Sequence, residues 1–240
     1  MPLHAGAAAA NAAIAPKSHK LRAIRDPYNT YALLGDGEAS LGDDLALFWP
    51  AMTATGVEDV LPRIVGLLNE IGVPFMIAGS FASNAHGLQR PTQDLDIVVD
   101  PDPKALEALI EAMPRASYHG DAEAARRALR ERSNFNVVDF ATATRIDFIV
   151  RKDRPFSRAE MERRVPMQML GVPVFVVSAE DTVIAELEWS KENGGSETQL
   201  RNVAGILARR RGELDLAYLA RWVEELGLAS EWAKASAAHG

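Results

Sequence analysis

The first clear pattern of hydrophobic and polar positions is an amphipathic helix over residues 57–71. Apolar side chains recur there every three or four residues, as one buried face of a helix requires. Gly72 follows the last of them, and Pro74 stands two residues further on. Because glycine favours a helix C-terminus and proline does not continue a helix, the pattern predicts that this helix ends at Gly72.

Short apolar runs between turn residues predict the strands that follow. They cover residues 75–78, 94–99, 135–140, 145–150 and 172–177. Helical patterns cover residues 104–113 and 122–132, and from Glu180 onward the patterns are helical only. This order predicts an α+β fold with α/β-like character. We expect a small mixed sheet flanked by helices at residues 51–177 and a helical C-terminal region at residues 178–240.

The first 50 residues form a separate segment that resists assignment. Residues 1–25 contain no acidic residue, four basic ones and an alanine-rich run from Ala5 to Ala13. No Lys or Arg precedes that run, and the run is only weakly apolar, so it does not fit an export signal. We interpret residues 1–50 as an arm, and a basic arm that contacts RNA is the alternative.

Composition narrows the class of protein further. The chain has 240 residues, 48% of them hydrophobic, and 26 Lys and Arg against 33 Asp and Glu, which gives a net charge of −7. This mix is that of a globular protein, and the net acidity argues against one that coats nucleic acid. The absence of cysteine excludes disulfides, thiolate metal sites and a Cys nucleophile, and it fits a cytoplasmic location. No apolar run is long enough to span a membrane.

The most informative feature is a pair of aspartates on one predicted strand. Asp94 and Asp96 are separated by one residue, so their side chains point to the same face, about 6–7 Å apart along the strand. Two like charges held this close repel each other. A divalent cation removes the conflict, and Mg²⁺ prefers carboxylate oxygens together with substrate phosphates. The spacing therefore predicts a metal site at Asp94 and Asp96.

A phosphate-binding turn is predicted upstream, at Gly79 and Ser80. These residues end one strand and begin a short helix, where free backbone N–H groups favour an anion such as a triphosphate. Arg90 and Thr92 follow just before the paired aspartates. A third carboxylate is expected if two ions are bound; Asp147 on the 145–150 strand is the preferred candidate and Asp139 is its rival.

These residues resemble the polymerase-beta-like nucleotidyltransferase superfamily, and within it the AbiEii-type and minimal nucleotidyltransferases. The motifs are Gly79-Ser80, the run from Arg90 to Ile97, and the run from Arg145 to Phe148. The resemblance implies transfer of a nucleoside monophosphate from an NTP to a hydroxyl. It implies that Asp94, Asp96 and Asp147 bind two Mg²⁺ ions and that Gly79 and Ser80 hold the triphosphate, with Arg90 and Thr92 beside the nucleotide.

Two residues depart from the pattern of that group. Glu186 stands where members often carry a Lys, and Asn202 where they often carry an Asp. A Lys would neutralise phosphate charge and Glu186 would not, so another base is needed. Three candidates for that base stand in the sequence: Arg151, Lys191 and Arg201.

The resemblance leaves the acceptor open among an RNA end such as tRNA, a protein and a small molecule such as an antibiotic. It also suggests a toxin–antitoxin or phage-defence role, with an antitoxin partner or a homo-oligomer. The alternative is a weak or inactive protein that binds nucleotide as a regulator, which Glu186 favours. His86 is expected to pack rather than to bind a ligand, and Trp189 and Trp222 to lie in the core or a subunit interface.

Overall fold

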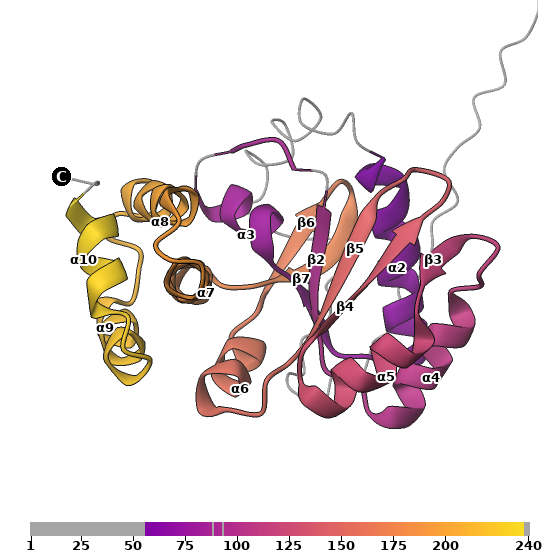
Figure 1. The fold of residues 1–240 in the computed structure, drawn as a ribbon. Coiled ribbons are helices and arrows are strands. Elements are labelled where there is room, and N and C mark those ends of the chain that lie inside the picture. Colours follow the sequence, from indigo (N-terminus) through magenta and orange to yellow (C-terminus); the bar gives the residue numbers. More distant parts are fainter. Residues whose placement is uncertain (1–55, 88, 93, 238–240) are drawn as a thin grey trace, which may run out of the picture.

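The computed structural model describes residues 56–87, 89–92 and 94–237. The predicted N-terminal arm lies outside these residues. Within them, a seven-stranded mixed sheet has the order β3-β4-β5-β2-β1-β7-β6 (Figure 1). Its strands are β1 (Phe75–Ile77), β2 (Asp94–Val99), β3 (Tyr118–Gly120), β4 (Asn134–Asp139), β5 (Arg145–Val150), β6 (Val165–Met169) and β7 (Val172–Val176). The pairs β2–β5 and β1–β7 are parallel, and the other neighbours are antiparallel.

Helices cover both faces of this sheet (Figure 1). One face carries α2 (Val57–Ile71), α4 (Pro103–Ala112) and α5 (Ala122–Glu131). The opposite face carries α3 (Gly79–His86) and α7 (Ala179–Glu192), and α6 (Pro155–Glu162) lies between β5 and β6 in the chain. The remaining described helices are α8 (Glu197–Arg209), α9 (Leu216–Glu225) and α10 (Ala229–Ala237). The predicted α+β class is confirmed, and no described helix has the length and apolar character needed to cross a membrane.

The alternation along β2 and β5 separates the core from the candidate site. Leu95 and Ile97 of β2 are fully buried beneath α2, α4 and α5, as is Phe148 of β5. Phe148 stacks on Phe135 of β4 with ring centroids 5.0 Å apart. Because neighbouring side chains of a strand point to opposite faces, these core residues force the intervening aspartates of β2 and β5 onto the other face.

A second apolar cluster holds the C-terminal helices together. It contains Trp222 and Leu219, and Phe156 of α6 packs edge-to-face on Trp222 with ring centroids 5.3 Å apart. Of the two predicted places for Trp222, the structure confirms the core. Trp189 is different. Its side chain is 54% exposed, so it does not lie in the core, and the predicted alternative, a subunit interface, stays a prediction. The predicted boundary near residue 177 stays a prediction.

The sequence patterns missed three elements, β3, α6 and β6. The strand β3 has only three residues at the edge of the sheet. Helix α6 begins at a proline, and the chain before it is rich in charge, so its apolar face is short. The strand β6 contains Pro166, which is tolerated because β6 is an edge strand.

His86 is a buried packing residue at the end of α3, as the sequence predicted. Its Nε2 lies 2.7 Å from the carbonyl oxygen of Val177, to which it donates, and Nδ1 has no partner among the described residues. Burial, with a further contribution from Arg210, lowers the pKa of His86 to about 4. The folded state therefore holds His86 neutral.

We expect the protein to lose stability as the pH falls from about 6.5 to about 4. Over that pH range the unfolded chain binds a proton at His86 and the folded chain does not. This difference lowers the free energy of unfolding by about 3 kcal/mol. Urea unfolding at pH 7 and pH 4.5 should show a smaller loss for His86→Gln than for the unsubstituted protein. His119→Gln, at an exposed histidine, is the control. If His86→Gln loses as much stability between pH 7 and pH 4.5 as the unsubstituted protein, His86 is not the source of the effect.

Candidate active site

The sheet brings the three predicted aspartates to one face of two neighbouring strands. Parallel pairing of β2 and β5 puts Asp96 opposite Asp147 and Asp94 opposite Arg145. Neighbouring strands lie about 4.8 Å apart, so Asp96 and Asp147 are direct neighbours across the sheet. Asn136 of β4 stands opposite Asp147 on the other side. A row of oxygen-bearing side chains therefore crosses three strands.

The charges of the three aspartates act on one another. Burial first, and then the nearby carboxylates of Asp147 and Asp94, raise the pKa of Asp96 to about 6. A hydrogen bond from the backbone N–H of Ser80 opposes this shift. Asp96 is thus a buried carboxyl group crowded by like charges, a condition that a bound cation would relieve.

Arg145 supplies a positive charge inside this group. Its Nη2 and Nε donate to Oδ1 of Asp147 at 2.8 and 3.1 Å. Sequence reasoning gave Arg145 no role, although its position two residues before Asp147 puts both side chains on one face.

Asp139, the rival third carboxylate, has a structural role. Its side chain is fully buried, pairs with Arg63 at 2.8 Å and accepts hydrogen bonds from the backbone and hydroxyl of Thr142. It does not face Asp147, because Asp147 is opposite Asn136. The structure therefore favours Asp147 over Asp139.

Gly79 brings the predicted phosphate-binding turn against Asp96. Its φ is +56°, and an added Cβ would stand 2.0 Å from Oδ2 of Asp96. Only glycine fits this approach without displacing the carboxylate. Helix α3 begins here, so its first N–H groups and the hydroxyl of Ser80 lie beside the aspartates.

Arg90 reaches the same turn from the chain that precedes β2. Its Nη2 donates to the hydroxyl of Ser80 at 2.9 Å, and its backbone exchanges two hydrogen bonds with the side-chain amide of Asn84, at 2.7 and 3.0 Å. Asn84 therefore holds the Arg90 backbone and Ser80 holds the guanidinium, whose buried Nε has no hydrogen-bond partner among the described residues. Thr92 donates to the Asp94 carbonyl at 3.4 Å.

The two departures from the family pattern contact each other. Nδ2 of Asn202 donates to Oε1 of Glu186 at 3.0 Å, and the hydroxyl of Ser83 donates to the same oxygen. Burial raises the pKa of Glu186, while these hydrogen bonds and the charge of Arg90 oppose the rise. This contact joins residues of α3, α7 and α8 that are far apart in the chain, so no local sequence pattern predicts it.

The three candidate bases are engaged with other groups, although Arg151 also lines the cleft that contains the aspartates. Lys191 donates to the carbonyls of Leu226 and Gly227, and Arg201 makes a 3.5 Å contact with Thr198. Arg151 pairs with Asp100 at 2.8 Å. Among the described residues, Arg90 is the cation that hydrogen-bonds to the Gly79-Ser80 turn.

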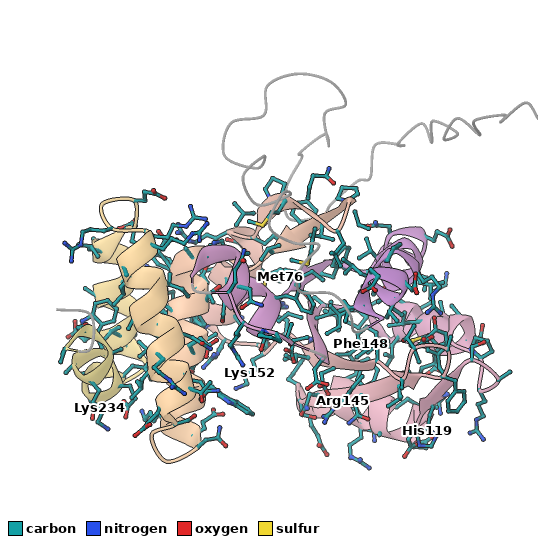
Figure 2. The ribbon with its side chains drawn as sticks, turned by 90° about the horizontal axis from the view of Figure 1, so that it is seen from above. Met76, His119, Arg145, Phe148, Lys152 and Lys234 are labelled. Atoms are coloured by element: carbon teal, nitrogen blue, oxygen red, sulfur yellow. The ribbon has the colours of Figure 1, made fainter. Side chains whose placement is uncertain are left out.

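One cleft of about 670 Å³ joins these groups. Among the described residues, its lining includes all of the predicted site residues except Thr92. The sheet forms one wall, and α7 with the chain after β5 forms the other. Figure 2 shows Arg145 on the sheet and Lys152 between the sheet and the C-terminal helices.

The donor set fits magnesium bound together with a nucleotide. Within the described chain, no three acidic or histidine side chains form a ready metal cage. Mg²⁺ does not need one, because it is usually held by one or two carboxylates, substrate phosphates and water. Asp96 and Asp147 supply the carboxylates, and Ser80 and Arg90 mark where the phosphates would lie.

No known protein family and no curated protein matches the sequence of this chain. Among solved structures, the antibiotic-resistance factor ANT(2'')-Ia is similar with a TM-score of 0.45 and 16% identity, covering 77% of this chain and 96% of that chain. The lincosamide antibiotic adenylyltransferase LnuA has a TM-score of 0.43 and 14% identity, covering 62% and 95%. A CCA-adding enzyme with CTP has a TM-score of 0.35 and 11% identity, covering 79% and 56%. Because these scores lie below 0.5, we base the functional proposal on the side chains of the site.

We expect Gly79→Ala to disable the site by pushing the Asp96 carboxylate away from its position. The added methyl group would overlap Oδ2 of Asp96, and the left-handed backbone at Gly79 would add roughly 1 kcal/mol of strain. Binding of Mg·ATP, measured by calorimetry, should fall below detection.

Gly72→Ala is the matched control for Gly79→Ala. Gly72 has a φ of +81°, but its added Cβ would meet nothing within 4 Å. This variant should show the loss of stability from backbone strain and retain nucleotide binding. If both variants bind Mg·ATP equally well, the contact between Gly79 and Asp96 does not shape the site.

Proposed function

We propose that this protein is a magnesium-dependent nucleotidyltransferase of the polymerase-beta-like superfamily, similar to its AbiEii-type and minimal members. It would move a nucleoside monophosphate from an NTP to a hydroxyl. The observation that carries the proposal is the register of β2 and β5, which sets Asp96 beside Asp147 directly under the Gly79-Ser80 turn. Carboxylates and a phosphate-binding turn in one cleft are what this reaction requires.

Asp94, Asp96 and Asp147 would hold the metal ions. When bound, magnesium neutralises the triphosphate and lowers the pKa of the attacking hydroxyl. In the transfer, the acceptor oxygen forms a bond to the α-phosphorus, the bond from that phosphorus to the bridging oxygen breaks, and pyrophosphate leaves. The hydroxyl proton passes to a carboxylate or to water.

The protein's own groups would position the triphosphate. The first N–H groups of α3 and the hydroxyl of Ser80 provide donors, and Arg90 provides the positive charge that a lysine at position 186 would otherwise supply. Arg90 is fixed through Asn84, so little ordering is required when the nucleotide binds.

The acceptor, an antitoxin partner, homo-oligomer formation and a role in a toxin–antitoxin or phage-defence system stay predictions from the resemblance. The same is true of tRNA or a protein as acceptor and of a cytoplasmic location. The competing function, a nucleotide-binding regulator without transferase activity, is favoured by the carboxylate of Glu186, which lines the cleft.

We expect Asp96→Asn to lower nucleotidyl transfer on the order of 10³-fold, because a neutral amide does not replace a metal-binding carboxylate. The assay uses labelled NTPs with Mg²⁺ and pools of RNA, protein and small-molecule acceptors. Asp102→Asn is the control, since Asp102 caps α4, where asparagine caps equally well.

Two results would decide between the functions. Label transfer that depends on Asp96 supports the enzyme. Tight Mg·NTP binding without transfer to any acceptor supports the regulator and contradicts the proposed activity.

A further inference from the structure

Arg145 binds the carboxylate that the proposed reaction needs for a second cation. It stands two residues before Asp147 on β5, and its Nη2 and Nε donate to Oδ1 of Asp147 at 2.8 and 3.1 Å. Both side chains line the cleft. The pair therefore places a positive charge of the protein itself where the aspartates would otherwise attract a metal ion.

Other arginines that line this cleft pair with acids outside the group of three aspartates. Arg132 and Arg151 both bind Asp100, with contacts of 3.3 and 2.8 Å. In the described part of the chain, the ion pair that an aspartate of the group makes is the one with Arg145. The position of this arginine is therefore a feature of the site and not of the cleft wall in general.

The exposure of the pair indicates that folding does not depend on it. The side chain of Arg145 is 49% exposed and that of Asp147 is 13% exposed. An ion pair this open to solvent contributes little to stability, because water and dissolved salt screen the attraction. The effect of Arg145 on a divalent cation at Asp147 is larger, since the repulsion grows with the charge of the ion and both cations would share one carboxylate.

The charge of Arg145 also acts on the other two aspartates. Parallel pairing of β5 with β2 puts Arg145 directly opposite Asp94. Burial and the neighbouring carboxylates raise the pKa of Asp96, and the charge of Arg145 is among the groups that oppose this rise. Both nitrogens of Arg145 bind the same oxygen of Asp147, Oδ1, so the contact does not use Oδ2. A cation can therefore bind Asp147 with Arg145 in place, but it meets the repulsion of the guanidinium.

We infer that Arg145 is a positioning residue that acts through Asp147 and weakens the binding of the second cation there. The first cation binds at Asp94 and Asp96 together with the triphosphate, whereas the second must overcome the charge of Arg145 and depends on oxygen ligands from the substrates. This inference rests on the proposed function, because the two-ion reaction supplies the need for a cation at Asp147. Since the effect is electrostatic, Arg145→Lys preserves it and Arg145→Gln removes it.

The experiment counts bound Mn²⁺ by electron paramagnetic resonance, in which the unbound ion gives the signal. The full chain is titrated with α,β-methylene-ATP present, an analogue whose P–C–P bridge is not cleaved in the transfer. The unsubstituted protein should bind one Mn²⁺ tightly with the analogue and a second one more weakly. Arg145→Gln should tighten the second site on the order of tenfold, and this gain should shrink at high KCl because dissolved ions screen the repulsion.

Matched variants separate the charge of Arg145 from its hydrogen bonds. Arg145→Lys keeps the charge and should keep the weak second site. Lys152→Gln removes one positive charge from the same cleft, at a half-exposed side chain 4.0 Å from Glu192, and should change the second site by less than about threefold. Asp147→Asn should abolish the second site, and adding Arg145→Gln to it should restore nothing, because the effect acts through Asp147.

The outcomes keep this inference apart from the proposed function. Weaker Mn²⁺ binding in Arg145→Gln would overturn the inference and would make Arg145 a residue that orients Asp147 for the metal. An unchanged second site in Arg145→Gln, an equal gain in Lys152→Gln, or no second Mn²⁺ in any variant would overturn it as well. Label transfer that depends on Asp96 would still establish the enzyme in those cases. The titration involves no acceptor, so a gain in Arg145→Gln without any label transfer contradicts the proposed activity alone.

Discussion

The repulsion between carboxylates on adjacent strands is the constraint around which this molecule is arranged. The β2–β5 register places Asp96 next to Asp147. The fully buried residues that alternate with these aspartates along each strand prevent the acids from turning to the other face of the sheet. Three features lower the cost of this repulsion: the Ser80 N–H on Asp96, the Arg145 guanidinium on Asp147, and the exposure of Asp94 to solvent.

Glu186 has a local explanation once Asn202 and Ser83 are seen as its partners. A carboxylate with an asparagine carries one negative charge, whereas a lysine with an aspartate is neutral. The Glu186–Asn202 pair still ties α3, α7 and α8 together through hydrogen bonds. The positive charge has a different source, Arg90, on the chain that leads into β2. The Gly79-Ser80 turn thus keeps a cation beside it although position 186 holds an acid.

Local sequence patterns predicted the parts of the site that depend on strand and helix periodicity. The two-residue spacing of Asp94 and Asp96 predicted their common face, and Gly79, the first residue of α3, predicted the turn. Local patterns could not predict which strands are neighbours, because the pairing of β2 with β5 joins segments about fifty residues apart in the chain. The same holds for the contact of Asn202 with Glu186. Helix α6 was missed for a third reason, because its charged segment has too short an apolar face to predict a helix.

The connection after β5 has a mechanical consequence. It leaves the strand that carries Asp147 and is fastened to α7 by two ion pairs of unequal exposure, Arg154–Glu188, which is largely shielded, and Lys152–Glu192, which is half-exposed. Dissolved ions screen the outer pair far more than the inner one. Raising the ionic strength therefore weakens Lys152–Glu192 before Arg154–Glu188. The width of the cleft entrance then depends on the salt concentration as well as on the fold.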